Sequence, residues 1–204
     1  VADARGLLCN MTHRGATGAD PRDGDGAGVM TGIPHELLSR DVKRNFGIVL
    51  TDAGTYAVGN VFMSPEPSIL RDSQQKFEEV AESLGLNVIC WRPVPVDNSM
   101  LGPSSKSKEP AILQAFITMV RGPNDEFDAV KFETLLYIFR KKCTNVLGMK
   151  KWFYICSLSS KLIVYKGLLS PVHVYQYFLD LTDSRYKSHF CLVHSRFSTN
   201  TFPS

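Results

Sequence analysis

The sequence lacks an apolar run long enough to cross a membrane. A spanning helix needs roughly 20 apolar residues in a row, and polar or charged residues break every apolar stretch of this chain well before that length. A signal-peptide pattern is also missing, because the opening "VADARGLLCN" carries charge within its only apolar stretch. We expect an intracellular protein with no membrane segment. The sequence does not indicate whether that location is the cytoplasm or an organelle such as a plastid or mitochondrion.

Charge of one sign is scarce as well. The chain has 23 Lys and Arg against 20 Asp and Glu, a net charge of +3, which is too small to indicate binding of nucleic acid. The clusters "RKKC" at 140–143 and "MKKW" at 149–152 flank the end of a predicted helix and are typical of a solvated face. We therefore expect no nucleic-acid partner.

Motifs for metals and common cofactors are absent. No CxxC pair joins the five cysteines, and the five histidines have no ligand-like spacing. No HExxH, GxSxG or GxxxxGK[ST] occurs. We expect no metal site, and we interpret the cysteines as buried free thiols of a reducing compartment. These cysteines are Cys9, Cys90, Cys143, Cys156 and Cys191.

The glycine-rich stretch "DPRDGDGAG" at 20–28 fits neither a dinucleotide nor a calcium site. Its glycines are spaced GxGxG, and Val29 stands where the last glycine of a GxGxxG fingerprint belongs. A calcium loop that began at Asp23 would have Ala27 and Pro34 in place of acidic ligands. A tight structural turn is the expected role.

What the chain does have is 204 residues and a 44% hydrophobic content, enough for one sizeable core or two small ones. Periodicity and turn chemistry predict a mixture of helices and strands. We expect two β-rich runs in "WFYICSLSSKLIVYKG" to pair as a hairpin, with "LSSK" as its turn. The predicted helices are 1–11, 34–46, 64–84, 128–144 and 170–181, and the predicted strands are 29–33, 56–63, 87–96, 111–120, 152–157, 162–167 and 190–193.

Inward faces follow from the same periodicity. We expect Ile69, Phe77 and Val80 to face the core from the long helix at 64–84. We expect Val130 and Ile138 among the apolar face of the helix at 128–144. The polar segment Asp97–Pro110 is long for a connection, so we predict a functional surface loop that contacts another part of a larger protein.

The last stretch, "HSRFSTNTFPS" at 194–204, follows a strand and gathers basic, aromatic, hydroxyl and amide side chains. The guanidinium of Arg196 offers a planar fork that matches a carboxylate. The end of a strand is a stiff place from which to present it. An ion pair with a neighbouring Asp or Glu is an equally good interpretation from the local sequence alone.

Four segments, taken in order, resemble glutamate synthase, a class II glutamine amidotransferase. They are "MTHRGATGADPRDGDGAG" at 11–28, "WRPVPVDNSMLGPSSKSKEPAILQAF" at 91–116, "WFYICSLSSKLIVYKGLL" at 152–169 and "YFLDLTDSRYKSHFCLVHSRFSTNTFPS" at 177–204. The resemblance covers the whole chain. The short "HRG" and "HSRFST" patterns also occur in other class II amidotransferases, and "VPVDNSMLGP" separates glutamate synthase from them.

The resemblance implies an α+β fold, an Ntn-hydrolase-like αββα sandwich of two antiparallel sheets. It also implies a mechanism in which an amino-terminal cysteine attacks the side-chain amide of glutamine, ammonia leaves, and water releases glutamate from the thioester. No residue before "THRG" matches that cysteine, and we do not assign the role to Cys9. We expect residues 1–204 to be part of one amidotransferase domain, with the nucleophile segment upstream and the oxyanion segment downstream. The chain alone is then expected to be inactive, with no catalytic residue.

Site residues carried over from the resemblance lie at both ends of the chain. Arg196 matches the residue that binds the α-carboxylate of glutamine, and Phe197 and Thr199 match the same motif as lining residues of the pocket. Arg14 and Asn200 are expected to support the site.

The resemblance also implies partners. Glutamine is the substrate, and ammonia passes to another domain of the same polypeptide, where glutamate is made from 2-oxoglutarate. That domain uses FMN and an iron–sulfur cluster, with NAD(P)H or ferredoxin as the electron donor and a small reductase subunit or domain in some members. The alternative is a catalytically dead amidotransferase-like module with a binding or structural role.

Overall fold

The computed structural model describes residues 2–15, 22, 24, 26–122, 124–147 and 153–196. The chain divides into two compact units, each built from segments that are far apart in the sequence. We call residues 1–32, 95–109 and 164–204 the three-stranded unit, and residues 33–94 and 110–163 the four-stranded unit, after the sheets that they carry. Both sheets are antiparallel, which confirms the expected α+β class and agrees with an Ntn-hydrolase-like domain.

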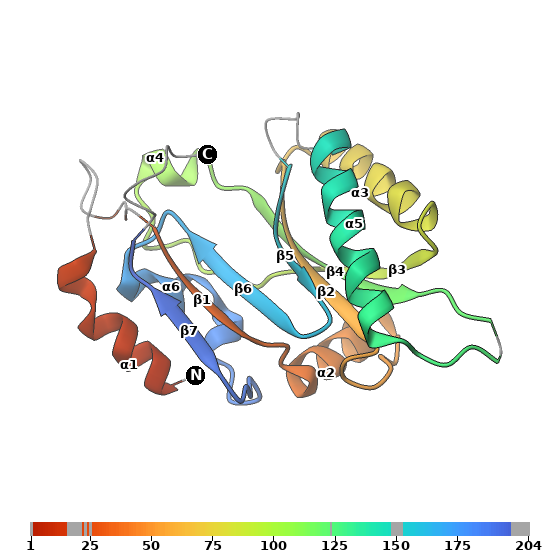
Figure 1. Ribbon diagram of the computed structural model, residues 1–204. Helices are drawn as coiled ribbons and strands as arrows, with labels where there is room; N and C mark the ends of the chain where they lie inside the picture. Colours follow the sequence, from red (N-terminus) through yellow and green to blue (C-terminus); the bar gives the residue numbers. More distant parts are fainter. Residues whose placement is uncertain are drawn as a thin grey trace. The chain divides into compact units, whose positions relative to one another are not determined.

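The four-stranded sheet has the order β3-β4-β2-β5, and every neighbouring pair is antiparallel. Helices α3 and α5 contact each other and pack on this sheet (Figure 1). Its strands are β2 (Tyr56–Met63), β3 (Leu86–Pro93), β4 (Ala111–Met119) and β5 (Phe153–Ser159), and its helices are α2 (His35–Phe46), α3 (Pro67–Glu82) and α5 (Ala129–Leu147).

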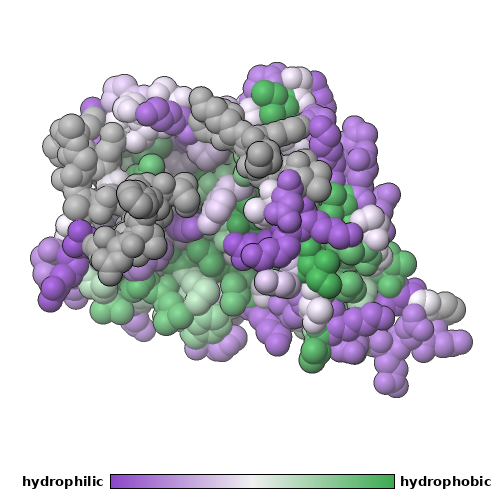
Figure 2. All heavy atoms as spheres, turned by 45° about the horizontal axis from the view of Figure 1, so that its top comes forward, coloured by the Kyte–Doolittle hydropathy of each residue, from purple (hydrophilic) through white to green (hydrophobic). Residues whose placement is uncertain are grey.

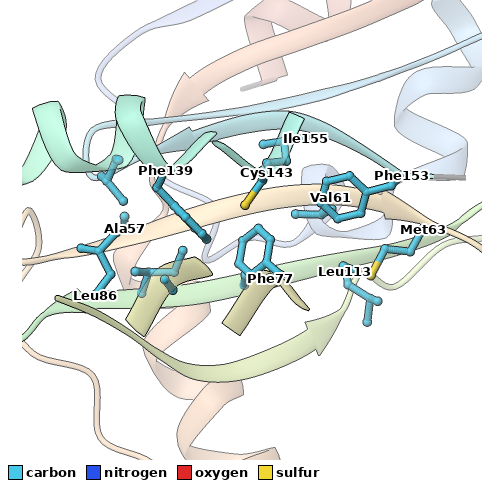
Figure 3. Close-up of a cluster of buried hydrophobic side chains, with 14 of the residues drawn as sticks. Ala57, Val61, Met63, Phe77, Leu86, Leu113, Phe139, Cys143, Phe153 and Ile155 are labelled. Atoms are coloured by element: carbon cyan, nitrogen blue, oxygen red, sulfur yellow. The ribbon is translucent and has the colours of Figure 1, made fainter. Parts of the chain in front are cut away.

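Phe77 of α3 lies at the centre of the core between these helices and the sheet, with Phe139 of α5 edge-on to it at a ring separation of 4.6 Å (Figure 3). The sheet contributes the small or branched side chains of alternate residues, among them Ala57, Val61 and Ile155. Alternate residues of a strand point to the same face, so these side chains share the face of the sheet that α3 and α5 cover. Burial of these side chains is the main favourable contribution to the folding of this unit.

The helix boundaries follow from local chemistry. Gly47 ends α2 in the left-handed conformation with a φ of 71°, as its position after the apolar periodicity predicts. Glu66 caps the start of α3, where its carboxylate accepts hydrogen bonds from the backbone N–H groups of Ser68 and Ile69. The hydroxyl of Ser68 also donates to this carboxylate, and this hydrogen bond together with the two backbone bonds lowers the pKa of the Glu66 carboxyl below its usual value. Pro67 suits the first turn because it has no N–H to satisfy there.

Three inward assignments were wrong. Ile69, Val130 and Ile138 are all exposed, and Val130 is the most exposed at 78%. The core face of α5 is instead formed by residues such as Phe132, Leu136 and Phe139. Ile69 and Val130 lie in the first turns of their helices. Other large apolar side chains are exposed as well, and the surface in Figure 2 mixes hydrophobic with hydrophilic residues.

The expected hairpin does not form. β5 pairs with β2 in the four-stranded sheet, whereas β6 (Leu162–Gly167) is an edge strand of the other sheet. Glu133 of α5 holds the connection: its carboxylate accepts hydrogen bonds from the backbone N–H of Ser160 at 2.6 Å and from the Ser160 hydroxyl at 2.7 Å. The turn was predicted correctly, but the strands on its two sides join different sheets.

The three-stranded sheet has the order β6-β1-β7. β1 (Ala27–Gly32) lies at its centre and pairs antiparallel with β7 (Cys191–His194). Helix α1 (Ala2–Asn10) contacts β7 and lies beside it in Figure 1, and α6 (Pro171–Tyr177) contacts both α1 and β1. Two 3-10 turns complete the unit, η1 (Thr12–Arg14) and η2 (Leu179–Thr182).

The polar segment Asp97–Pro110 contains a short helix, α4 (Pro103–Lys106), and is attached to the end of α6. The backbone N–H of Asp97 donates to the carbonyl of Tyr177 at 2.9 Å. The Glu109 carboxylate accepts hydrogen bonds from the Tyr177 hydroxyl at 2.6 Å and from the Asn98 amide at 2.8 Å. Both ends of the segment are therefore fixed to the three-stranded unit, and its contact with another part of a larger protein stays a prediction.

Candidate functional site

The two arginines that the sequence singles out lie on neighbouring stretches of backbone in the three-stranded unit. Arg14 ends the turn η1, and Arg196 follows β7 by two residues. A Cβ built on Gly15 would lie 3.5 Å from the carbonyl oxygen of Ser195. The residue after Arg14 therefore packs against the residue before Arg196, and the "HRG" and "HSR" segments meet although they come from opposite ends of the chain.

Local structure explains why the first of these segments turns where it does. The backbone N–H of Arg14 donates to the carbonyl of Met11 at 2.8 Å, and that of Gly15 donates to Thr12 at 3.0 Å. The same Gly15 Cβ position would lie 3.5 Å from Cδ of Pro171, in the first turn of α6. The turn is thus held between the start of α6 and the end of β7.

Both arginine side chains are exposed, whereas Ser195 is buried. The buried serine fixes the backbone directly before Arg196. An arginine guanidinium suits the recognition of a carboxylate, because its planar fork can bind both oxygens. The other expected site residues, Phe197, Thr199 and Asn200, lie outside the described residues.

The strand that leads to Arg196 lies against a glycine. Gly28 of β1 is the register partner of His194. A Cβ on Gly28 would lie 2.5 Å from Cε1 of His194 and 2.7 Å from Cβ of Lys166, which is closer than Cβ atoms approach in folded proteins. Burial lowers the pKa of His194 below its usual value, and the positive charge of Lys166 lowers it further. Both effects favour the uncharged imidazole.

Tyrosine hydroxyls support the sheet beneath the site. The hydroxyl groups of Tyr186 and Thr31 lie 2.6 Å apart, and the hydroxyl of Tyr165 donates to the carboxylate of Asp180 at 2.9 Å. Burial raises the pKa of Tyr186 above its usual value. Because these hydroxyls are bonded, their burial is compensated, and the strands β1 and β6 are held in fixed positions.

A second polar cluster, which the sequence did not predict, lies in the four-stranded unit. Arg92 is only 2% exposed, and its guanidinium donates to the Asp41 carboxylate and to the Gln114 side-chain oxygen, both at 2.8 Å. A buried arginine requires such partners. The only sequence signal would have been a charged residue in a strand among apolar neighbours.

The cysteines of the described part of the chain are free thiols, as expected, but only Cys143 and Cys156 are buried, whereas Cys9, Cys90 and Cys191 are partly exposed. Burial raises the pKa of Cys90 to about 11 and that of Cys143 to about 12. Neutral thiols of this kind are poor nucleophiles. Cys9 lies on α1, and nothing in its surroundings assigns it a catalytic role.

Within the described ranges, no group of three or more His, Cys, Asp and Glu side chains is arranged to hold a metal ion. None of the helices described combines the length and apolar character needed to cross a membrane.

Comparison with protein families identifies the family of the chain. Residues 1–204 match the family model of class II glutamine amidotransferases, and the chain belongs to that family. The family expected from the resemblance is thereby confirmed.

The relatives that it matches are glutamate synthases. The chain is 56% identical over 206 residues to "Glutamate synthase [NADH]" of Schizosaccharomyces pombe, covering 100% of this chain and 10% of that protein. It is 40% identical over 200 residues to "Glutamate synthase [NADPH] large chain" of Bacillus subtilis, covering 97% of this chain and 13% of that one. It is also 40% identical over 206 residues to "Ferredoxin-dependent glutamate synthase 2" of a Synechocystis strain, covering 100% and 13%. The chain thus spans about a tenth of the length of these relatives.

Proposed function

We propose that this chain is part of the glutaminase domain of a glutamate synthase, and that Arg196 binds the α-carboxylate of the glutamine substrate. The contact between Gly15 and Ser195 supports this proposal most directly, because it brings the two amidotransferase segments together in one unit. The class II family membership and the glutamate synthase relatives support it independently.

The other site residues follow in the same proposal. Phe197 and Thr199 line the glutamine pocket beside Arg196, and Arg14 and Asn200 support the site from the adjacent backbone. The nucleophile segment belongs upstream of residues 1–204 and the oxyanion segment downstream, so that these residues form part of one domain. No catalytic residue is assigned to this chain.

In the whole polypeptide, glutamine hydrolysis would supply ammonia to a synthase domain that makes glutamate from 2-oxoglutarate. That domain would hold FMN and an iron–sulfur cluster, neither of which binds to this chain. The electron donor is NADH, NADPH or ferredoxin, since the names of the relatives include all three. Delivery of electrons from NAD(P)H would add a small reductase subunit or domain as a partner. An intracellular location, in the cytoplasm or an organelle, completes the proposal.

The test uses the full-length polypeptide that contains this chain. Arg196→Lys keeps the charge and loses the planar fork. Loss of a charge-assisted hydrogen bond costs on the order of 1.5–3 kcal/mol, so we expect the KM for glutamine to rise about tenfold to a hundredfold. If Arg196 binds substrate and transition state equally, kcat should stay close to its original value. Synthesis driven by free ammonia should be unchanged, because it bypasses the glutamine pocket.

Arg185→Lys is a matched control. Arg185 lies in the same unit and pairs with Asp183 near the surface, so the same substitution there should leave both activities within about twofold. Equal damage by Arg196→Lys to glutamine-driven and ammonia-driven synthesis would indicate a folding role. No effect would remove Arg196 from the site. Absence of any glutamine-driven activity in the unmodified polypeptide would favour the catalytically dead module.

A further inference from the structure

Three neighbouring strands place Lys166, Gly28 and His194 side by side on one face of the three-stranded sheet. β1 lies between β6 and β7, and Gly28 is the register partner of His194. The Cε1 atom of His194 and the Cβ atom of Lys166 both reach into the space where a side chain on Gly28 would stand, at 2.5 and 2.7 Å from its Cβ position. The imidazole therefore occupies a gap that only glycine leaves open.

Arg196 follows closely on this strand. β7 ends at His194, and the backbone bends at Ser195 and Arg196. Ser195 is buried, whereas His194 and Arg196 are exposed. Arg196 therefore lies two residues beyond the last paired residue of β7, and its direction depends on where that residue is held.

β7 is a short edge strand, and its register with β1 runs from Thr31↔Cys191 to Gly28↔His194. Helix α1 also contacts β7. Just beyond His194, Ser195 packs against Gly15. The ring at His194 stands at the last paired position, immediately before the residues that present the arginine.

We propose that His194 is a positioning residue for Arg196: its ring, lodged over Gly28 and against Lys166, fixes the end of β7 and so the direction of the guanidinium. The inference rests on the proposed role of Arg196 in binding glutamine. The ring acts by its shape. Partial burial of the ring and the positive charge of Lys166 lower its pKa, which favours the uncharged imidazole beside the carboxylate site.

The chain supplies a matched control in His189, which precedes β7 by two residues. His189 lies against Gly32, where a Cβ would be 3.2 Å from Cε1 of His189. His189 is exposed, as His194 is, and its ring lies against that of Phe190. Both histidines thus pack on a glycine of β1, but only His194 adjoins Arg196.

The experiment measures glutamine-driven and ammonia-driven synthesis in the full-length polypeptide with His194→Ala, His194→Phe and His189→Ala. A small misplacement of a binding group can cost up to about a hundredfold in activity, and we expect His194→Ala to raise the KM for glutamine by about tenfold, with kcat and the ammonia-driven rate within about twofold. His194→Phe keeps a ring and should stay within about twofold of the unmodified protein in KM. His189→Ala should change neither activity by more than that factor.

A double variant separates positioning from general stability. If His194 acts through Arg196, His194→Ala should raise the KM little further once Arg196→Lys is present, because coupled residues are not additive. The proposal is overturned if His194→Ala leaves the KM unchanged, if His189→Ala or His194→Phe raises it equally, or if the two effects simply multiply. An unchanged KM in Arg196→Lys would contradict the proposed function itself. A raised KM in Arg196→Lys together with an unchanged KM in His194→Ala would contradict only the positioning role.

Discussion

The four-stranded unit and the three-stranded unit bury their large side chains in different ways. In the first, the aromatic rings of Phe77, Phe132 and Phe139 are completely buried and have no polar atom to satisfy. In the second, the buried rings are largely tyrosines, and the hydroxyls of Tyr165 and Tyr186 each have a hydrogen-bonding partner. Apolar contacts are non-directional, whereas a hydrogen bond fixes distance and angle.

The difference shows in which unit hydrogen bonds fix the positions of the buried rings. The candidate site lies in the three-stranded unit, where hydrogen bonds of buried tyrosines reach β1 and β6, two strands of the sheet that carries Arg196. The four-stranded unit also has a buried hydrogen-bonded cluster, that of Arg92, Asp41 and Gln114, but it carries none of the expected site residues. Three predictions can break or sharpen this comparison.

The largest effect is expected from Phe77→Ala in the four-stranded unit. Phe77 is fully buried among residues of α5 and the sheet, and truncating a phenylalanine in such a place costs about 3–5 kcal/mol of the free energy of unfolding. Ile69→Ala, on the same helix but at an exposed position, should change it by less than about 0.5 kcal/mol. Denaturant titration of both variants measures this. Equal destabilisation would mean that Ile69 faces the core, as its periodicity first indicated.

A smaller effect is expected from Tyr186→Phe in the three-stranded unit. The substitution keeps the ring and removes the hydroxyl that lies 2.6 Å from the hydroxyl of Thr31. Because the Thr31 hydroxyl also donates to the Gly32 carbonyl at 2.8 Å, it keeps one partner. We therefore expect a loss of about 0.5–1.5 kcal/mol.

Tyr137→Phe is the control for this loss, since Tyr137 is an exposed residue of the other unit. Thermal unfolding of the two variants would show the difference. A loss of stability in Tyr137→Phe as large as that in Tyr186→Phe would remove the distinction between the two kinds of core.

The smallest effect at neutral pH concerns Cys143 of the four-stranded unit. Burial raises the pKa of its thiol from 9.0 to about 12. Between these pH values the folded protein keeps the proton, whereas the unfolded chain loses it. Ionisation of this thiol therefore has no effect on the free energy of unfolding below pH 9, and it lowers that free energy progressively as the pH rises towards 12. In native protein at pH 8, iodoacetamide should modify the partly exposed Cys9 well before Cys143. Mass spectrometry of the two peptides decides this, and equal native rates would contradict the assigned burial.

Local signals predicted much of the fold. Pro34 and Gly47 bracket α2, and Gly85 follows the end of α3. Proline suits the start of a helix because its φ is fixed near the helical value, and glycine suits the end because it adopts a positive φ. The inward faces were less predictable. Ile69 lies in the first turn of its helix, where the core no longer covers it, and periodicity along a helix does not reveal how far a neighbouring sheet extends.

Pairing partners were beyond local signals. The turn at Ser159 and Ser160 was correct, but its carboxylate partner Glu133 comes from a helix more than 20 residues earlier, and the strands on either side join different sheets. Likewise, the contact between Gly15 and Ser195 depends on a long-range arrangement. Arg14 and Arg196 could be expected in one site only through the family resemblance, and the gap over Gly28 could not be expected at all.

The division into two units, made of three and two segments of chain, has a consequence for how the protein folds as it is synthesised. The chain passes from one unit to the other after residues 32, 94, 109 and 163. β1 therefore emerges early but cannot pair with β7 until residues 191–194 have been made. By then the complete sequence of the four-stranded unit has been made, so this unit can fold first. The pairing of β1 with β7 closes a long loop of chain and is therefore slow. The sheet that carries Arg196 is accordingly the last to be completed, and ribosome-bound chains shorter than about residue 190 should hold a protected four-stranded core and a β1 that still lacks its partner β7.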